Sequence, residues 1–165
     1  MEKEVIDYTW AQLGNDVAVL NMMMGNTMNE SGYNYFPDYV VGILRGGMIP
    51  AIMLSHKLNV PIIPLQWSLR DHKAQDLFAM NDIIHLLINR KNVLIVDDIV
   101  DSGATLKSIQ AKIENAEHVK ETVFTGLKYA ALLTNNEHIG LVDYTAGTIN
   151  RKNDKRWVVF PWEYR

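Results

Sequence analysis

The 165-residue chain contains no cysteine, which excludes disulfides, thiolate metal sites and cysteine nucleophiles. Its five histidines form no pair at ligand spacing on one face, so we expect no histidine metal site. No apolar run approaches the roughly 20 residues that a membrane-spanning helix needs. The first residues are charged rather than apolar, so we expect no secretory signal. Together these absences predict a cytoplasmic protein without a membrane span.

An excess of charge of one sign is also lacking. The formal net charge is −3 at pH 7, whereas a nucleic-acid-binding surface requires clustered positive charge. We therefore expect no nucleic-acid partner. Hydrophobic residues make up 48% of the chain, which is enough to bury the core of one domain spanning residues 1–165.

The hydrophobic pattern alternates between the periods of strands and helices. Thr9 and Gln12 have capping-box spacing before a first helix that begins at Trp10. Residues 68–81 are polar and predict a long mobile loop, which is usually functional at that length. Residues 83–88 fit a helix or a strand, and we favour a strand. The other expected elements are helices over 49–58 and 105–114 and strands over 39–44, 60–65, 92–96, 122–129 and 157–160. This alternation predicts an α/β fold with a mainly parallel twisted sheet flanked by helices.

The segment from Val93 to Leu106 is the most informative part of the chain. An apolar run is followed by two adjacent acids, Asp97 and Asp98. A third acid, Asp101, precedes a loop of small and hydroxylic residues. In an open α/β sheet, ligands bind at the carboxyl ends of the strands. The loop offers backbone N–H groups and a helix N-terminus, which suit a phosphate. Acids beside an anion site indicate a ligand that carries both hydroxyls and phosphate, such as a ribose 5-phosphate.

A second motif follows the first strand of the expected sheet. Arg45, Gly46 and Gly47 stand between that strand and a helix. Glycine lets backbone N–H groups approach an anion closely, and arginine presents a planar fork of donors to phosphate oxygens. This connection therefore predicts a second phosphate-binding loop.

These two motifs closely resemble those of type I phosphoribosyltransferases, which use phosphoribosyl pyrophosphate (PRPP). The resemblance implies their fold, with a small hood region, and a homodimer or homotetramer. It also implies a cis peptide bond between Leu44 and Arg45. The implied PRPP-binding residues are Arg45, Gly46, Asp97, Asp98, Ile99, Val100, Asp101, Ser102, Gly103, Ala104 and Thr105.

The resemblance also divides PRPP among these residues. Residues 102–105 would bind the 5-phosphate, Asp97 and Asp98 the ribose hydroxyls, and Arg45 and Gly46 the pyrophosphate. Pyrophosphate needs a hard counter-cation, and we expect Mg²⁺ held by Asp98, with Glu163 as a weaker candidate ligand. Asp101 would act as the general base or would orient the incoming base.

The third group of residues points to a heterocyclic base. Trp157 could supply a flat apolar face, Val158 part of a polar rim through its backbone, and Lys128, at the end of its strand, a donor to an exocyclic oxygen. With Asp101, these are the expected purine-binding residues. Lys128, Trp157 and the sequence Pro161-Trp162-Glu163 resemble the 6-oxopurine branch of the family, which includes bacterial xanthine-guanine and hypoxanthine phosphoribosyltransferases. The implied function is purine salvage.

Two alternatives remain open at this point. The chain could be a non-catalytic regulator that senses PRPP or nucleotides, although it has no basic excess or added DNA-binding segment. It could also be a pyrimidine or adenine phosphoribosyltransferase. Lys128 together with Trp157 argues against both, because a lysine donor suits an oxo group. Hypoxanthine, guanine and xanthine all stay possible substrates.

Overall fold

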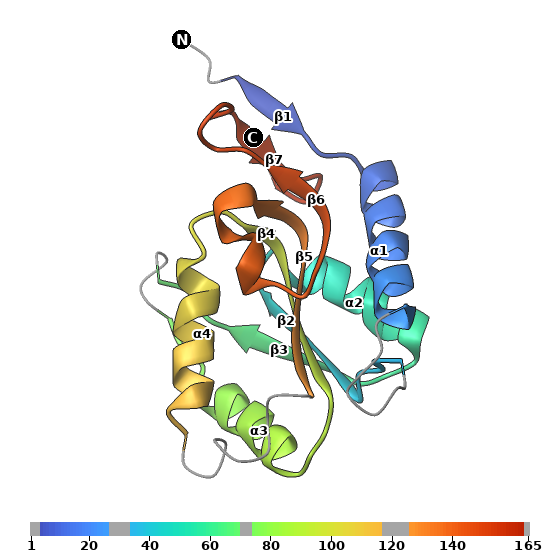
Figure 1. Ribbon diagram of the computed structural model, residues 1–165, viewed down its shortest axis with the longest axis vertical. Helices are drawn as coiled ribbons and strands as arrows, with labels where there is room; N and C mark the ends of the chain where they lie inside the picture. Colours follow the sequence, from blue (N-terminus) through green and yellow to red (C-terminus); the bar gives the residue numbers. More distant parts are fainter. Residues whose placement is uncertain (1–3, 27–33, 70–73, 117–125, 164–165) are drawn as a thin grey trace.

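Strand β4 (Val93–Val100) is the centre of a five-stranded sheet in which all strands are parallel. The computed structural model describes residues 4–26, 34–69, 74–116 and 126–163 (Figure 1). The order across the sheet is β3 (Ile62–Gln66), β2 (Tyr39–Leu44), β4, β5 (Leu127–Asn135) and β6 (Tyr144–Ile149). A short 3₁₀ segment, η1 (Asn136–Leu141), connects β5 to β6.

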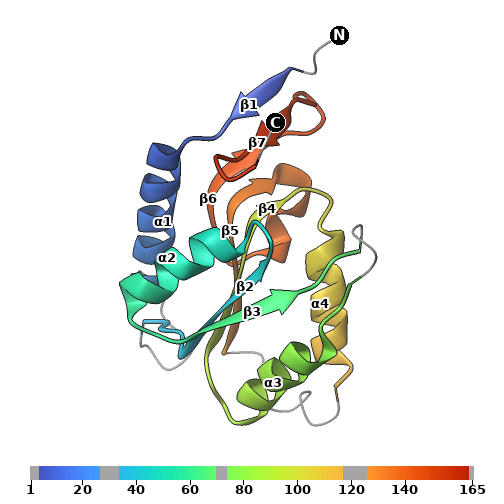
Figure 2. The same ribbon diagram turned by 180° about the vertical axis from the view of Figure 1, so that it is seen from behind.

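Helices cover both faces of this sheet (Figures 1 and 2). One face packs against α1 (Trp10–Gly25) and α2 (Met48–Leu58), and the other against α3 (Leu77–Ile88) and α4 (Ala104–Glu114). Alternate residues of β4 enter the two cores: Leu94 and Val96 the first, Val93 and Ile95 the second. Burial on both faces explains why β4 begins with a continuous apolar run. The predicted α/β fold is confirmed.

A second, smaller sheet lies at one end of the molecule, where β1 (Val5–Asp7) pairs in parallel with β7 (Trp157–Val159). Aromatic contacts hold the segment after β7 in place. Phe160 stacks on Trp162 with ring centroids 4.8 Å apart, and Trp162 in turn contacts Trp10 of α1 at 6.0 Å. We identify this two-stranded sheet with the small hood region that was expected.

The prediction of a strand over residues 83–88 is wrong, because these residues belong to helix α3. The side chain of Asp76 caps the helix by accepting from the N–H groups of Phe78 and Ala79, both at 3.0 Å. Apolar residues then recur at the helical period and are buried: Met80, Ile83, Ile84 and Leu87. The predicted loop over 68–81 therefore ends at Asp76, and its residues 70–73 lie outside the described part of the chain.

The prediction that Lys128 ends a strand is also wrong. Strand β5 starts at Leu127 and continues to Asn135, because the apolar run extends well past Lys128. The first residues of the predicted strand, 122–125, lie outside the described ranges. Strands β1 and β6 were not predicted, and β4 continues past the expected end at Val96 to Val100. Asp97 and Asp98 therefore lie inside the last half of β4.

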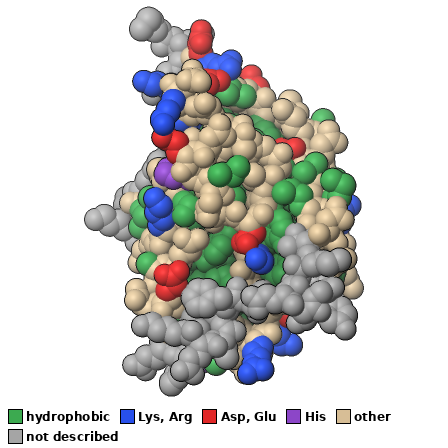
Figure 3. Space-filling view, viewed as in Figure 1, with side chains coloured by type: hydrophobic (Ala, Val, Ile, Leu, Met, Phe, Trp, Pro, Cys, Tyr) green, Lys and Arg blue, Asp and Glu red, His purple; other side chains and the backbone are tan. Residues whose placement is uncertain are grey.

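Acidic and basic side chains are interspersed on the face drawn in Figure 3. This distribution agrees with the small net charge of the chain. Within the described ranges, no helix has both the length and the apolar character needed to cross a membrane.

Candidate active site

The central sheet opens at its carboxyl end between β2 and β4. These two strands pair only as far as Gly42 and Val96. Beyond that point β2 continues along β3, and β4 continues along β5 to Val100. The helices that follow the two strands also diverge, since α2 covers one face of the sheet and α4 the other. This is a topological switch point, where open α/β sheets place their ligands.

A cavity of about 360 Å³ lies at this end of β4. Its volume falls within the usual range for small-molecule sites. The loop between β4 and α4 forms one wall, and β7 with the residues after it forms another. The lining residues are Ser68, Leu69, Asp97, Asp98, Ile99, Val100, Asp101, Ser102, Gly103, Ala104, Thr105, Leu106, Arg151, Trp157, Val158, Phe160 and Glu163.

Two adjacent carboxylates form the floor of the cavity. Asp97 accepts a hydrogen bond from the N–H of Asp98 at 3.0 Å, and Asp98 accepts one from the N–H of Ile99 at 2.8 Å. Burial raises the pKa of Asp97 well above its ordinary value, and the charge of Asp98 raises it further. Burial also raises the pKa of Asp98, with a further contribution from the Glu163 carboxylate. This acidic group would be stabilised by a cation.

Asp98 and Glu163 are the two carboxylates expected from the sequence as ligands of such a cation. Both line the cavity, and the charge of Glu163 acts on Asp98. Within the described residues, no group of three or more potential ligands could enclose a metal ion. Two carboxylates fit a Mg²⁺ ion that takes most of its oxygen ligands from substrate and water.

The loop between β2 and α2 reaches the site through its glycines. A Cβ atom on Gly46 would lie 1.7 Å from Oδ2 of Asp98, and one on Gly47 would lie 2.6 Å from the carbonyl oxygen of Val96. The peptide bond between Leu44 and Arg45 is cis, which confirms that expectation. Among the described residues, Arg45 and Gly46 do not line the cavity wall. Gly46 adjoins the cavity through its contact with Asp98.

The loop between β4 and α4 has the conformation of an anion site. Gly103 has φ of +71° and precedes the first residue of α4. A Cβ atom at this position would lie 2.5 Å from Cδ1 of Leu141, so the turn requires glycine. The N–H of Ala104 makes only a long contact, 3.4 Å, with Oγ of Ser102, and no described side chain caps the helix. The first N–H groups of α4 thus stay available at the cavity wall.

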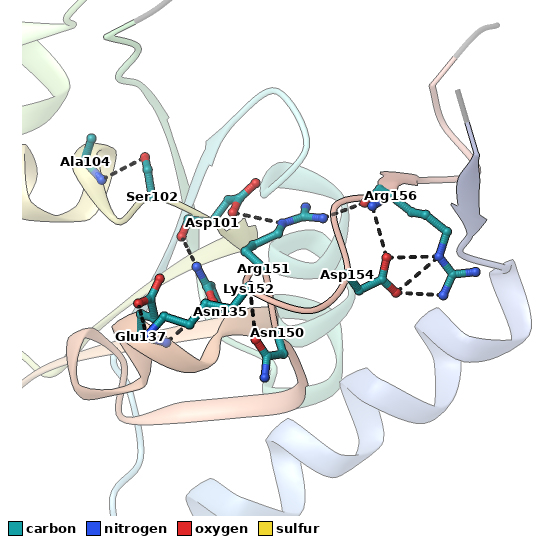
Figure 4. A network of polar contacts seen from close by, with 10 residues as sticks. All are labelled: Asp101, Ser102, Ala104, Asn135, Glu137, Asn150, Arg151, Lys152, Asp154 and Arg156. Carbon is teal, nitrogen blue, oxygen red and sulfur yellow. Dashed lines mark hydrogen bonds and ion pairs between the residues drawn. The ribbon is translucent and has the colours of Figure 1, made fainter. Parts of the chain in front are cut away.

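Asp101 is held by two residues of the network shown in Figure 4, Arg151 and Asn135. Its Oδ1 atom accepts a hydrogen bond from Nε of Arg151 at 3.0 Å, which also makes the two residues an ion pair. Its backbone carbonyl accepts from Nδ2 of Asn135 at 3.2 Å. The side chain of Asp101 is one-third exposed, toward the cavity that it lines. A carboxylate fixed in this way can accept a proton from a ligand in a defined orientation.

Sequence reasoning missed Arg151 and Asn135. Asn135 was missed because β5 was expected to end earlier. Arg151 was missed because β6, with its sequence Tyr-Thr-Ala-Gly-Thr-Ile, was not predicted. A predicted strand over residues 144–149 would have placed Arg151 just past the carboxyl end of that strand. Asp101 likewise follows the carboxyl end of β4, so the two residues would have been expected at the same end of the sheet. The sequence of β6 was therefore the one signal that could have identified Arg151 as a site residue.

The residues expected to bind the base are only partly brought together. Asp101, Trp157 and Val158 line the cavity, and Trp157 is 51% exposed rather than part of a core. Lys128 does not line it. It lies near the amino end of β5, whereas the cavity lies at the carboxyl end of β4. There its Nζ atom donates to Oδ1 of Asp143 at 2.8 Å. This position gives no support to the expected contact of Lys128 with the base.

Comparisons with known proteins agree with this geometry. Residues 10–165 match the phosphoribosyl transferase domain. The chain is 29% identical over 158 residues to a xanthine-guanine phosphoribosyltransferase of Chromohalobacter salexigens, covering 94% of this chain and 82% of that protein. It is 22% identical over 162 residues to the enzyme of the same name from Nitratidesulfovibrio vulgaris, covering 98% and 86%.

A solved structure is also similar over nearly its whole length. A purine phosphoribosyltransferase from Pyrococcus horikoshii superposes with a TM-score of 0.71 at 26% identity, covering 98% of this chain and 96% of that one. The family match extends over most of the sequence and includes every residue that lines the cavity. The chain therefore belongs to the phosphoribosyl transferase domain family, and its enzymatic class is that of a glycosyltransferase.

Proposed function

We propose that the protein transfers the 5-phosphoribosyl group of PRPP to a 6-oxopurine in purine salvage. The C1–oxygen bond to pyrophosphate breaks, a bond from C1 to a base nitrogen forms, and the products are a nucleoside 5′-monophosphate and pyrophosphate. One observation carries the proposal: a single cavity joins an acid pair, an uncapped helix N-terminus and an exposed tryptophan face. These features match the hydroxyls, the phosphate and the base.

The 5-phosphate binds at the loop between β4 and α4. Ser102 and Thr105 offer hydroxyls, and the first N–H groups of α4 have no side-chain cap in the described structure. The partial positive charge at the N-terminus of a helix favours a phosphate dianion there. Positive φ at Gly103 permits the turn that exposes these groups.

The ribose and the pyrophosphate bind at the opening between β2 and β4. Asp97 and Asp98 accept hydrogen bonds from the two ribose hydroxyls. Arg45 and the backbone of Gly46 hold the pyrophosphate, because Gly46 lies directly against the Asp98 carboxylate.

Mg²⁺ fits this site as a partner of the pyrophosphate. When bound, it supplies positive charge that neutralises the leaving group. Asp98 and Glu163 would hold it, directly or through water. Raised pKa values of Asp97 and Asp98 support this role, since a nearby cation relieves the repulsion that burial intensifies.

The base lies against Trp157, with the backbone of Val158 at its rim. Asp101 orients the base and accepts its proton as the base nitrogen bonds to C1. Ser68 and Leu69, which line the cavity from the segment after β3, help to keep water from the reacting carbon. Two relatives named as xanthine-guanine enzymes and a neighbour named as a purine enzyme support a purine as the acceptor.

Product analysis tests the proposal directly. The protein is incubated with PRPP, Mg²⁺ and hypoxanthine, guanine or xanthine, and the mixture is separated by chromatography. We expect the nucleoside 5′-monophosphate to form with at least one of these bases. Tight PRPP binding without product from any base would instead support the regulatory alternative.

A further inference from the structure

The side chain of Arg151 has an uncommon position for a loop arginine. Arg151 follows β6, and its side chain is only 17% exposed. The guanidinium donates from Nε to Oδ1 of Asp101 at 3.0 Å and from Nη1 to the backbone carbonyl of Arg156 (Figure 4). It also lines the cavity together with Trp157. The transfer proposed above assigns no role to this guanidinium.

Both members of the Asp101–Arg151 pair retain hydrogen-bonding capacity. A guanidinium carries five N–H donors, and in the described structure those of Nη2 have no partner. Oδ2 of Asp101 likewise has no partner among the described residues. Leaving such donors unsatisfied in a largely buried arginine is costly. Both residues line the cavity, so the pair can offer an acceptor oxygen of Asp101 and free N–H donors of Arg151 to a ligand there.

The loop that carries Arg151 is fixed by its own hydrogen bonds. The carbonyl oxygen of Asn150 accepts from the N–H of Asp154 at 2.8 Å, and the side chain of Asn150 accepts from the N–H of Lys152 at 3.1 Å. Arg156 and Asp154 form an ion pair at 2.7 Å that closes the other end of the loop. Arg151 is thus held in place before any ligand binds, as a recognition group should be.

We propose that Arg151 selects the base by donating a hydrogen bond to its 6-oxo group while Asp101 accepts from N7–H. This inference rests on the proposed function. A 6-oxopurine that carries its proton on N7 presents a donor and an acceptor on the same edge, which is the complement of the pair. A 6-aminopurine presents two donors there and leaves the guanidinium without an acceptor. Arg151 would thereby take the role that the sequence had suggested for Lys128, which does not line the cavity.

Steady-state kinetics with two bases tests the assignment. Hypoxanthine carries the 6-oxo group and unsubstituted purine lacks it, so the inhibition constant of purine against hypoxanthine is measured beside the KM of hypoxanthine. For Arg151→Ala we expect the KM of hypoxanthine to rise about 10- to 100-fold, as for loss of a charged hydrogen bond. We expect the inhibition constant of purine to change by less than about threefold, because purine has no oxygen for Arg151 to contact.

Lys152→Ala is the matched control. It removes one positive charge from the same loop, but the Lys152 side chain is 73% exposed and pairs with Glu137 at 2.9 Å, outside the cavity. We expect both constants to stay at their wild-type values. Arg151→Lys keeps a cationic donor without the planar fork, so its KM for hypoxanthine should lie between those of wild type and Arg151→Ala. If Arg151→Ala does not fold, the same two constants are compared between wild type and Arg151→Lys.

Equal changes in the two constants, or no change in either, would overturn the assignment of Arg151. A merely structural role would move both constants together because it would not distinguish an oxo group from a hydrogen atom. The result is separable from the proposed function. If wild-type protein makes no monophosphate from any base, the proposed function fails; if it does and the ratio of constants is unchanged, only the role of Arg151 fails.

Discussion

The α-carbon of Gly46 lies directly against the carboxylate of Asp98, although the two residues belong to different loops of the site. A Cβ atom on Gly46 would be 1.7 Å from Oδ2 of Asp98. The backbone of the β2–α2 loop and the second acid of the pair are therefore packed in contact. Any side chain at position 46 must displace the carboxylate or the loop.

Gly46→Ala should therefore impair turnover severely. A displacement of about 1 Å at a reacting group can cost about 100-fold in rate, and forcing a methyl into a packed site costs roughly 1–3 kcal/mol of stability. The rate of pyrophosphate release and the midpoint of urea denaturation measure the two effects. Gly14→Ala is the control, because nothing lies within 4 Å of a Cβ there in the exposed middle of α1. It should stabilise the protein by about 0.5–1 kcal/mol. Turnover at the wild-type rate in Gly46→Ala would contradict this packing.

The pKa of Asp97 predicts how stability depends on pH without ligands. Burial, with the charge of Asp98, raises this pKa well above 3.8, so the folded state holds the proton more tightly than the unfolded state. Its contribution to stability is present below pH 3.8 and is lost as pH rises through the raised pKa. Asp97→Asn cannot ionise and avoids this loss.

The advantage of Asp97→Asn over wild type should consequently grow as pH rises above about 4 and then level off. Urea denaturation of both proteins from about pH 4 to pH 8, without Mg²⁺, measures the difference. If the difference in the free energy of unfolding between the two proteins stays constant over that range, ionisation of Asp97 does not destabilise the fold.

Trp157→Ala should weaken the binding of the base and spare that of PRPP. Stacking of a base on an aromatic side chain contributes about 1–3 kcal/mol, so the KM of the purine should rise about tenfold or more. Lys128→Ala is the control, since Lys128 pairs with Asp143 away from the cavity. That variant should change the KM little and lose at most about 1 kcal/mol of stability. A larger effect on the purine KM from Lys128 than from Trp157 would place the base elsewhere.

Asp101→Asn should lower kcat by about 10²- to 10⁴-fold, the usual contribution of general acid–base catalysis. The substitution keeps the size of the side chain and the backbone carbonyl that Asn135 contacts. PRPP affinity, measured by calorimetry, should consequently change by less than about threefold. A variant with a kcat within about threefold of wild type would remove Asp101 from the proton transfer.

The sequence predicted the parts of the fold in which local pattern and burial agree. The apolar run before Asp97 is buried on both faces, and the capping box at Thr9 starts α1 as expected. Residues 83–88 were misassigned because a short apolar run has no clear period by itself. The N-cap at Asp76, several residues earlier, decides that it is a helix.

The candidate site shows the same limit. The acid pair and the following loop are contiguous, so sequence alone could place them beside one another. The contact of Arg151 with Asp101 joins residues 50 positions apart and depends on where β6 ends. The wrong prediction for Lys128 has the same origin. Because the end of β5 was set too early, Lys128 was expected at the carboxyl end of the strand, whereas it lies near the amino end.

Pyrophosphate release from PRPP tests the central claim most directly. The purified protein is supplied with PRPP and Mg²⁺ and with each purine and pyrimidine base in turn, and Asp101→Asn provides the background rate. We predict release that depends on a 6-oxopurine and on Mg²⁺, well above that of adenine, uracil or no base. Release that is equal with all bases, or absent with every 6-oxopurine, would contradict the assignment of this cavity to purine phosphoribosyl transfer.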